Sequence, residues 1–108
     1  MMKSTDPPIG ADMPLYALIG YDGPRGAELR KLHRSAHLEG IDELFAQDRI
    51  HHAGPLLDEG GAPIGSLILF EAETLDEARR IAADDPYVTE GVFDSHEVRE
   101  TRIVRGRS

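Results

Sequence analysis

The stretch Leu15-Tyr16-Ala17-Leu18-Ile19-Gly20-Tyr21 is a continuous apolar run, and the period of the sequence changes directly after it. An apolar run this short predicts a buried strand. The turn residues Asp22-Gly23-Pro24 end it. From Arg25 to Asp48 apolar residues recur at helical spacing, with polar residues over the remaining surface, which predicts an amphipathic helix of several turns. The first unit of the fold is therefore a strand that leads into a helix.

The predicted helix has one apolar face. Its central position is Gly40, which lowers helix propensity, so we expect the helix to approach a sheet closely there. An α-helix turns by about 100° per residue, and at this spacing the apolar residues fall on one side of the helix. The residues that we place on this face are Leu29, Leu32, Ala36, Gly40, Ile41 and Leu44.

A hairpin follows the helix. Residues 50–57 predict one strand, residues 64–73 predict its partner, and Asp58-Glu59-Gly60-Gly61 forms the turn between them. Gly54-Pro55 lies within the first of these strands. Because proline has no N–H to donate to a neighbouring strand, it predicts either a bulge or the edge of the sheet.

The second half of the chain repeats the helix–strand pattern. Thr74-Leu75-Asp76-Glu77 matches a capping box, in which Thr74 caps the helix and Glu77 reaches back to it. Asp84-Asp85-Pro86 ends this short helix, because a residue before proline avoids helical angles. Residues 92–104 predict a last, rather polar strand.

The resulting order is β-α-β-β-α-β. This order predicts a ferredoxin-like α+β fold, in which one antiparallel sheet carries both helices on one face. We divide the chain into a flexible tail (residues 1–13), one domain (residues 14–104) and a C-terminal tail (residues 105–108). The chain has no third layer to cover the other sheet face, so we expect a homodimer.

Composition narrows the classes of function. The 108 residues include 12 Lys and Arg against 20 Asp and Glu, a net charge of −8, which argues against nucleic acid as a partner. Without cysteine there is no disulfide, thiolate nucleophile or Cys-ligated metal. No apolar run reaches the roughly 20 residues of a membrane span, and no signal peptide is evident. We expect a cytoplasmic protein whose partner is a small molecule, with no membrane role.

Histidines are the first candidates for chemistry. His33 and His37 lie one turn apart, and both are expected on the inner side of the first helix. One of them could line a cavity as an acid–base group. Alternatively, both are satisfied histidines at the helix–sheet boundary. Their spacing also suits metal binding, but no third ligand stands out, so no metal site is predicted.

Asp85 has two interpretations as well. It could simply end the helix, since Asp-Pro is a common turn pair. It could instead hold an imidazole, because a carboxylate on one ring nitrogen fixes the tautomer and raises basicity. His51 and His52 are adjacent and are expected to face opposite sides of their strand, whereas His96 is expected at the surface. No nucleotide-binding or serine-hydrolase motif is present, and no organic cofactor is expected.

Three motifs resemble the YCII-related family of small YciI-like proteins. They are R-x-x-H-L at residues 34–38, A-G-P at residues 53–55, and D-P-Y-x-x-x-G-V at residues 85–92. The resemblance covers about residues 14–104 and implies a ferredoxin-like fold of the dimeric α+β barrel type. It also implies a site centred on His37 and Asp85, with Gly54, Pro55 and Ser66 lining the same cavity. The family includes a dehydrochlorinase that acts on a chlorinated hydroxyhydroquinone.

Two functions remain open at this stage. In the first, His37 held by Asp85 moves a proton on a small cyclic or aromatic substrate, which gives elimination or isomerisation. Ser66 and backbone N–H groups near Gly54 would bind a developing oxyanion, and Arg34 would attract an anionic substrate. In the second, the protein is a non-catalytic dimeric module that binds a small ligand or a protein. An open, ligand-sized cavity at His37 would favour the enzyme.

Overall fold

The computed structural model describes residues 13–106. Most of the expected N-terminal tail, and the last two residues of the C-terminal one, lie outside this range. In chain order the elements are β1 (Leu15–Asp22), α1 (Gly26–Ala46), β2 (Ile50–Leu57), β3 (Pro63–Glu71), α2 (Leu75–Ala83), α3 (Pro86–Thr89) and β4 (Phe93–Thr101).

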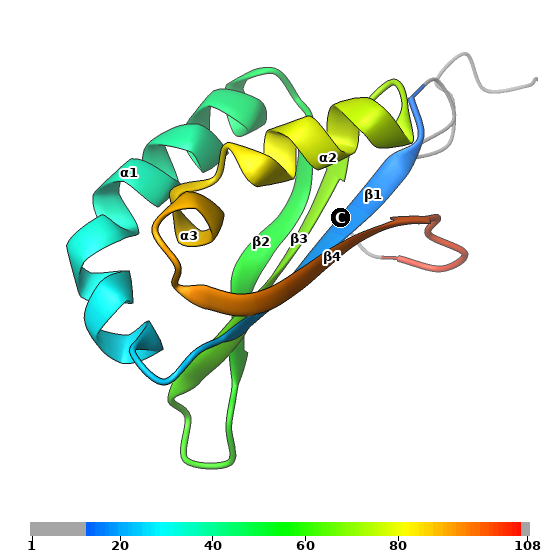
Figure 1. The fold of residues 1–108 in the computed structure, drawn as a ribbon. Coiled ribbons are helices and arrows are strands. Elements are labelled where there is room, and N and C mark those ends of the chain that lie inside the picture. The colour runs from blue at the N-terminus through cyan, green and yellow to red at the C-terminus, as the bar shows by residue number, and fades with distance from the viewer. Residues whose placement is uncertain (1–12, 107–108) are drawn as a thin grey trace, which may run out of the picture.

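The four strands form one antiparallel sheet in the order β2-β3-β1-β4. The helices all lie over the same face of this sheet (Figure 1). Leu18 of β1 pairs with Ile68 of β3 on one side and with Val98 of β4 on the other. The strands and the two longer helices confirm the predicted β-α-β-β-α-β order. The described residues form an α+β fold with the ferredoxin-like strand arrangement.

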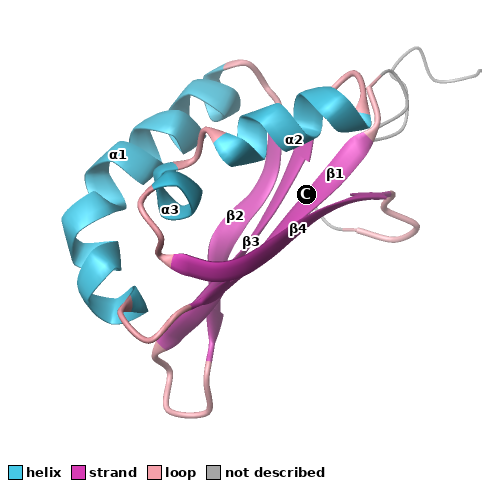
Figure 2. Ribbon diagram, in the orientation of Figure 1, coloured by secondary structure: helices cyan, strands magenta, loops and turns pink. Residues whose placement is uncertain are grey.

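A third helix, α3, corrects the expectation of two. As predicted, α2 ends before Asp84-Asp85-Pro86, but a new helix, α3, begins at Pro86 (Figure 2). Asp85 is its N-cap, because its side chain accepts a hydrogen bond from the Tyr87 N–H at 2.8 Å. Pro86 occupies the first turn, where its missing N–H costs nothing. The same dipeptide that ends α2 therefore starts α3.

The main core lies between the sheet and α2. Large side chains of the central strands pack against small ones of the helix, so that α2 comes close to the sheet. The buried members of this core are Tyr16, Leu18, Ile68, Phe70, Ala72, Ala78 and Ala82. Thr74 caps α2 as predicted and accepts from the Glu77 N–H at 3.0 Å. The Glu77 carboxylate accepts from the Glu73 N–H at 2.6 Å, one residue before the expected partner.

The predicted apolar face of α1 coincides with the inner face only in part, because Leu29, Ile41 and Leu44 are half-buried while the other half of the predicted face is exposed. Leu32 is 66% exposed, Ala36 and Gly40 are exposed, and a Cβ at Gly40 would have no neighbour within 4 Å. The close approach expected at Gly40 is therefore wrong. The residues that face inward are partly polar, with His37 buried and Arg30 half-buried. A pattern based on apolar residues misses such a face.

The β2–β3 hairpin has Pro55 at the edge of the sheet, as one of the two predicted alternatives requires. The bulges lie elsewhere, between Ile50 and His52 and between Leu56 and Leu57. His51 bonds the Glu71 carboxylate at 2.5 Å. His52 pairs with Leu69, and Leu69 and Glu71 are two residues apart on β3, so they point to the same face of the sheet. Both histidines therefore lie on that face, away from the helices. The expectation that they face opposite sides is wrong, because the first bulge inserts an extra residue.

Candidate active site

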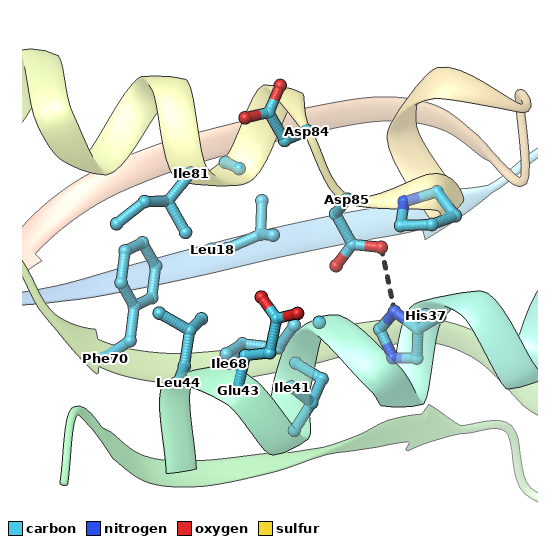
Figure 3. Close-up of a pocket in the computed structure, with 13 residues that line it drawn as sticks. Leu18, His37, Ile41, Glu43, Leu44, Ile68, Phe70, Ile81, Asp84 and Asp85 are labelled. Carbon is cyan, nitrogen blue, oxygen red and sulfur yellow. Dashed lines mark hydrogen bonds and ion pairs between the residues drawn. The ribbon is translucent and has the colours of Figure 1, made fainter. Parts of the chain in front are cut away.

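His37 and Asp85 meet between α1 and the start of α3. Nδ1 of His37 lies 2.8 Å from Oδ1 of Asp85, and each side chain is about one-tenth exposed (Figure 3). The same carboxylate oxygen accepts the Tyr87 N–H that caps α3. An ionised carboxylate can only accept, so Nδ1 of a neutral His37 must carry the proton. The other ring nitrogen, Nε2, is then left with its lone pair.

Nε2 of His37 forms no hydrogen bond with any residue in the range 13–106. No fully buried, unpartnered side-chain nitrogen or oxygen occurs in that range either. The atom therefore keeps some contact with solvent and is not sealed in the core. A histidine with one nitrogen anchored and the other accessible has the arrangement of a general base.

Tyr87 fixes the plane of the imidazole. The His37 and Tyr87 rings are stacked with centroids 3.8 Å apart and planes 1° apart. The Tyr87 and Phe93 rings form a T-shaped pair, with centroids 5.8 Å apart and planes at 85°. Phe93 in turn lies over Gly20, where a Cβ would fall 2.5 Å from the phenyl ring. A small residue on β1 thus sets the position of the aromatic pair.

Arg30 holds the other side of this cluster. Its guanidinium pairs with both carboxylate oxygens of Asp22, at 2.6 and 2.9 Å. The same group donates to the Gly65 carbonyl at 2.7 Å and to Oγ of Ser66 at 3.1 Å. Its Cζ atom also lies 5.0 Å from the centre of the Tyr87 ring, within cation–π range. Arg30 therefore links β1, β3 and α3 to α1.

Burial and charge move two pKa values in this cluster. Burial raises the pKa of the Tyr87 phenol, and the nearby Arg30 and Arg34 charges offset only part of that effect. For Arg30, burial alone would lower the pKa, but the hydrogen bonds and charge of Asp22 outweigh it and hold the pKa above its usual value. Both groups keep their protons through the neutral range, so Tyr87 is a neutral phenol and Arg30 a cation.

Two cavities flank His37. The larger cavity, about 430 Å³, lies between α1 and β2, and the imidazole forms part of its wall. The smaller cavity, about 200 Å³, lies between α1 and α2 and contains Asp85 (Figure 3). A volume of 430 Å³ falls in the range of small-molecule sites. The predicted binding residues, which include one helix residue and three on the hairpin strands, all line the larger cavity: Arg34, Gly54, Pro55 and Ser66.

The remaining histidines lie apart from this site. His33 is half-buried, with Nε2 at 4.0 Å from Glu90, and His96 is exposed on β4. His51 and His52 lie toward the opposite sheet face, as described above. Within residues 13–106, no three His, Asp or Glu side chains are grouped in a way that could hold a metal ion. None of the helices described is long and apolar enough to cross a membrane.

Sequence reasoning missed three members of the cluster, which are Asp22, Arg30 and Tyr87. One signal was available, because Arg30 precedes His37 by seven residues, or two helical turns, and so shares its face. Tyr87 belongs to the D-P-Y motif, yet nothing in the local sequence places its ring on His37. For Asp22, the sequence Asp22-Gly23-Pro24 indicates only a turn.

Comparisons with known proteins identify relatives of this chain. The sequence model of the YCII-related domain family matches residues 14–102. Protein YciI of Escherichia coli is 34% identical over 96 residues, which is 83% of this chain and 98% of that protein. An uncharacterised protein of Haemophilus influenzae is 34% identical over 84 residues, which is 72% of this chain and 86% of that protein.

A solved structure is similar over most of its length. It is the 5-chloro-2-hydroxyhydroquinone dehydrochlorinase TftG of Burkholderia phenoliruptrix AC1100, in complex with 2,5-dihydroxybenzoquinone. The TM-score is 0.74 at 28% sequence identity, and the match covers 82% of this chain and 93% of TftG. The similarity confirms the expected fold class, the ferredoxin-like fold of the dimeric α+β barrel type. With the domain model matching nearly the whole described chain, this protein belongs to the YCII-related family.

Proposed function

We propose that this protein is a small enzyme in which His37, held by Asp85, transfers a proton on a small cyclic or aromatic substrate. The observation that carries this proposal is the 2.8 Å contact from Nδ1 to Asp85, which leaves Nε2 as the unprotonated nitrogen of a residue that lines the larger cavity. A filled core around His37 would instead have favoured a structural role. The reaction is an elimination or an isomerisation, since both begin with removal of one proton.

In the proposed reaction, Nε2 takes a proton from the substrate and His37 becomes an imidazolium. The electron pair of the broken bond forms a new double bond in the substrate. In an elimination, the leaving group departs with its bonding electrons. In an isomerisation, the imidazolium returns the proton at another atom. Asp85 stabilises the imidazolium, and such acid–base catalysis supplies on the order of 10² to 10⁴ in rate.

Ser66 is suited to bind negative charge that develops on a substrate oxygen. Its Oγ already accepts a hydrogen bond from Arg30, so its own hydrogen is free to donate into the larger cavity. A buried hydroxyl donor placed in advance stabilises an oxyanion without reorganisation. Gly54 and Pro55 form the opposing wall on β2.

The similarity to TftG supports a hydroxylated six-membered ring as the substrate. By its name, TftG removes hydrogen chloride from 5-chloro-2-hydroxyhydroquinone. The shared fold and the 28% identity over most of both chains make this compound the first one to test. We carry over the reaction class, loss of a proton and a leaving group, and not a particular natural substrate.

The test is chloride release from 5-chloro-2-hydroxyhydroquinone, kept free of air because hydroquinones oxidise. We expect His37→Gln and Asp85→Asn to lose activity by about a hundredfold or more. His33→Gln is the matched control, since His33 lies on the same helix and has no contact with Asp85. Activity in His37→Gln equal to that of the control would contradict the proposal. Binding of 2,5-dihydroxybenzoquinone without any turnover would favour the non-catalytic binding module.

We further propose that two copies pair through the sheet face opposite the helices. Ile19, Leu67 and Leu69 are only half-buried on this face, and no described helix lies over it (Figure 1). Burial of apolar area drives such pairing, and a twofold dimer uses the same patch on both copies. The partner of this protein would then be a second copy of itself.

A further inference from the structure

The two cavities beside His37 differ in the sign of their charge. Among residues 13–106, the larger cavity is lined by Arg30, Lys31 and Arg34 and by no Asp or Glu. Within the part of the chain that the structure describes, the smaller cavity is lined by Glu43, Asp84 and Asp85 and by no Lys or Arg. The chain as a whole carries a net charge of −8, so the larger cavity reverses the prevailing sign. A cleft lined by one sign of charge raises the local concentration of ligands of the opposite sign.

Of the three cationic side chains in the larger cavity, only Arg30 forms an ion pair with a carboxylate in residues 13–106. The Arg30 guanidinium is paired with both oxygens of Asp22, so its charge is compensated. Lys31 and Arg34 form no ion pair with any carboxylate in residues 13–106. Both are exposed on α1, on the side that borders the larger cavity. Two cations at the mouth therefore remain available to a ligand.

The interior of the larger cavity suits a flat, mostly apolar body. Its walls include Ile68, Pro55 and the Tyr87 ring, and Ser66, which is 3% exposed, contributes a buried hydroxyl. Arg34 is close enough to Tyr87 for its charge to act on the phenol. A ring that lies against these walls would present one oxygen to Ser66 and another to the mouth.

We propose that the substrate of the larger cavity is a small ring that carries a negative oxygen, which binds Arg34 and Lys31 while the ring lies beside His37 Nε2. This inference rests on the proposed function and adds the substrate class to it. The negative oxygen belongs either to a carboxylate attached to the ring or to an ionised ring hydroxyl. Charge-assisted hydrogen bonds from Arg and Lys recognise both groups.

The test measures binding by amide chemical shifts in NMR, which requires no turnover. The probes are benzoate for the carboxylate, 2,5-dihydroxybenzoquinone for the ring oxyanion, and benzyl alcohol as the neutral ring. We expect the Kd of at least one anionic probe to be about tenfold or more below that of benzyl alcohol. Which of the two binds more tightly identifies the source of the charge. Equal affinity for anionic and neutral rings, or no saturable shift with either anion, would overturn the inference.

Variants locate the effect. Arg34→Gln should weaken anion binding by about threefold to tenfold and leave the neutral ring unaffected, and Lys31→Gln should act in the same direction. Arg79→Gln is the control, because Arg79 is an exposed cation on α2 that lines neither cavity. An equal loss in Arg34→Gln and Arg79→Gln would show only a general charge effect and would overturn the inference.

Two further measurements separate this inference from the proposed function. Raising the ionic strength from about 0.01 M to about 0.15 M shortens the screening length from about 30 Å to about 8 Å, and it should weaken only the anionic probes. His37→Gln should keep the preference for anions, although the proposed function requires it to lose activity. Loss of that preference in His37→Gln would assign the anion to the imidazolium and overturn the inference. Anion binding without turnover in the wild type would leave it standing while the proposed function fails.

Discussion

The imidazole of His37 lies parallel to the phenol ring of Tyr87, with the two ring centres 3.8 Å apart. Asp85 holds the edge of the same imidazole, and its oxygen also accepts the Tyr87 N–H. The face and the edge of His37 are thus fixed by residues that are two apart in the chain. A catalytic base needs this kind of fixed direction, because proton transfer depends on a short, aligned approach.

Tyr87 should make the protein sensitive to alkaline pH. Burial raises the pKa of Tyr87 and of Tyr16 above the usual 10.0. The stability that these neutral phenols contribute is complete below pH 10.0 and is lost as the pH rises through their folded-state pKa values. Tyr87→Phe keeps the ring stack and removes the contribution of Tyr87. The variant should therefore lose less folding stability at alkaline pH than the wild type does. Urea unfolding across this pH range measures the effect, and identical alkaline losses in both proteins would contradict it.

Gly20 allows Phe93 to reach the aromatic cluster. A Cβ at this position would lie 2.5 Å from the phenyl ring, so Gly20→Ala must displace it. We expect a destabilisation of about 1–3 kcal/mol, as for other overpacked sites. Gly40→Ala is the contrasting variant, since a Cβ there meets nothing within 4 Å and helix propensity should stabilise it by up to about 1 kcal/mol. Chemical denaturation that shows the same sign for both variants would refute this explanation.

The Arg30–Asp22 pair should matter more than other ion pairs of the fold. Its side chains are 13% and 8% exposed, so removal of Arg30 leaves a buried, uncompensated carboxylate. We expect Arg30→Gln to cost about 3 kcal/mol or more in the free energy of unfolding. Arg25→Gln breaks the exposed pair with Glu28 and should have little effect. Equal losses in the two variants, measured by denaturant unfolding, would disprove the difference.

The proposed dimer depends on the apolar sheet face. Leu69 pairs with Ala17 and His52 on this face, so Leu69→Lys would place a charge in the interface. We expect the wild type to be dimeric and Leu69→Lys to be monomeric by light scattering over a range of concentrations. Leu57→Lys, in an exposed position on the hairpin, should stay dimeric. A monomeric wild type would rule out this pairing.

The order of the strands and of the two longer helices could be predicted because each of these elements carries its own local signal. Residues 15–21 have the apolar run of a strand, and Thr74 caps its helix with its own side chain. The inner face of α1 could not be predicted in this way. Arg30 tolerates burial only because Asp22 on β1 and the Gly65 carbonyl on β3 receive its hydrogen bonds. The helix therefore turns a polar side inward and leaves Leu32 exposed.

The candidate site shows a similar division. His37 and Asp85 are 48 residues apart, and no local period connects them. Their pairing was implied by the resemblance to a family, whereas the residues themselves left a purely structural role open. The stacking of Tyr87 was not foreseen, because it depends on the turn from α2 into α3. Tertiary contacts, rather than local propensity, assemble the site.

The central claim is that His37 carries its proton on Nδ1 and offers Nε2 as a base. Long-range ¹H–¹⁵N NMR of the imidazole, at a pH where the ring is neutral, reports the tautomer directly. We predict protonated Nδ1 and unprotonated Nε2 in the wild type, and a shift toward the other tautomer in Asp85→Ala, which leaves no acceptor for Nδ1–H. If the wild type instead carries its proton on Nε2, or if Asp85→Ala leaves the tautomer unchanged, Asp85 does not orient His37 and the proposed proton transfer is wrong.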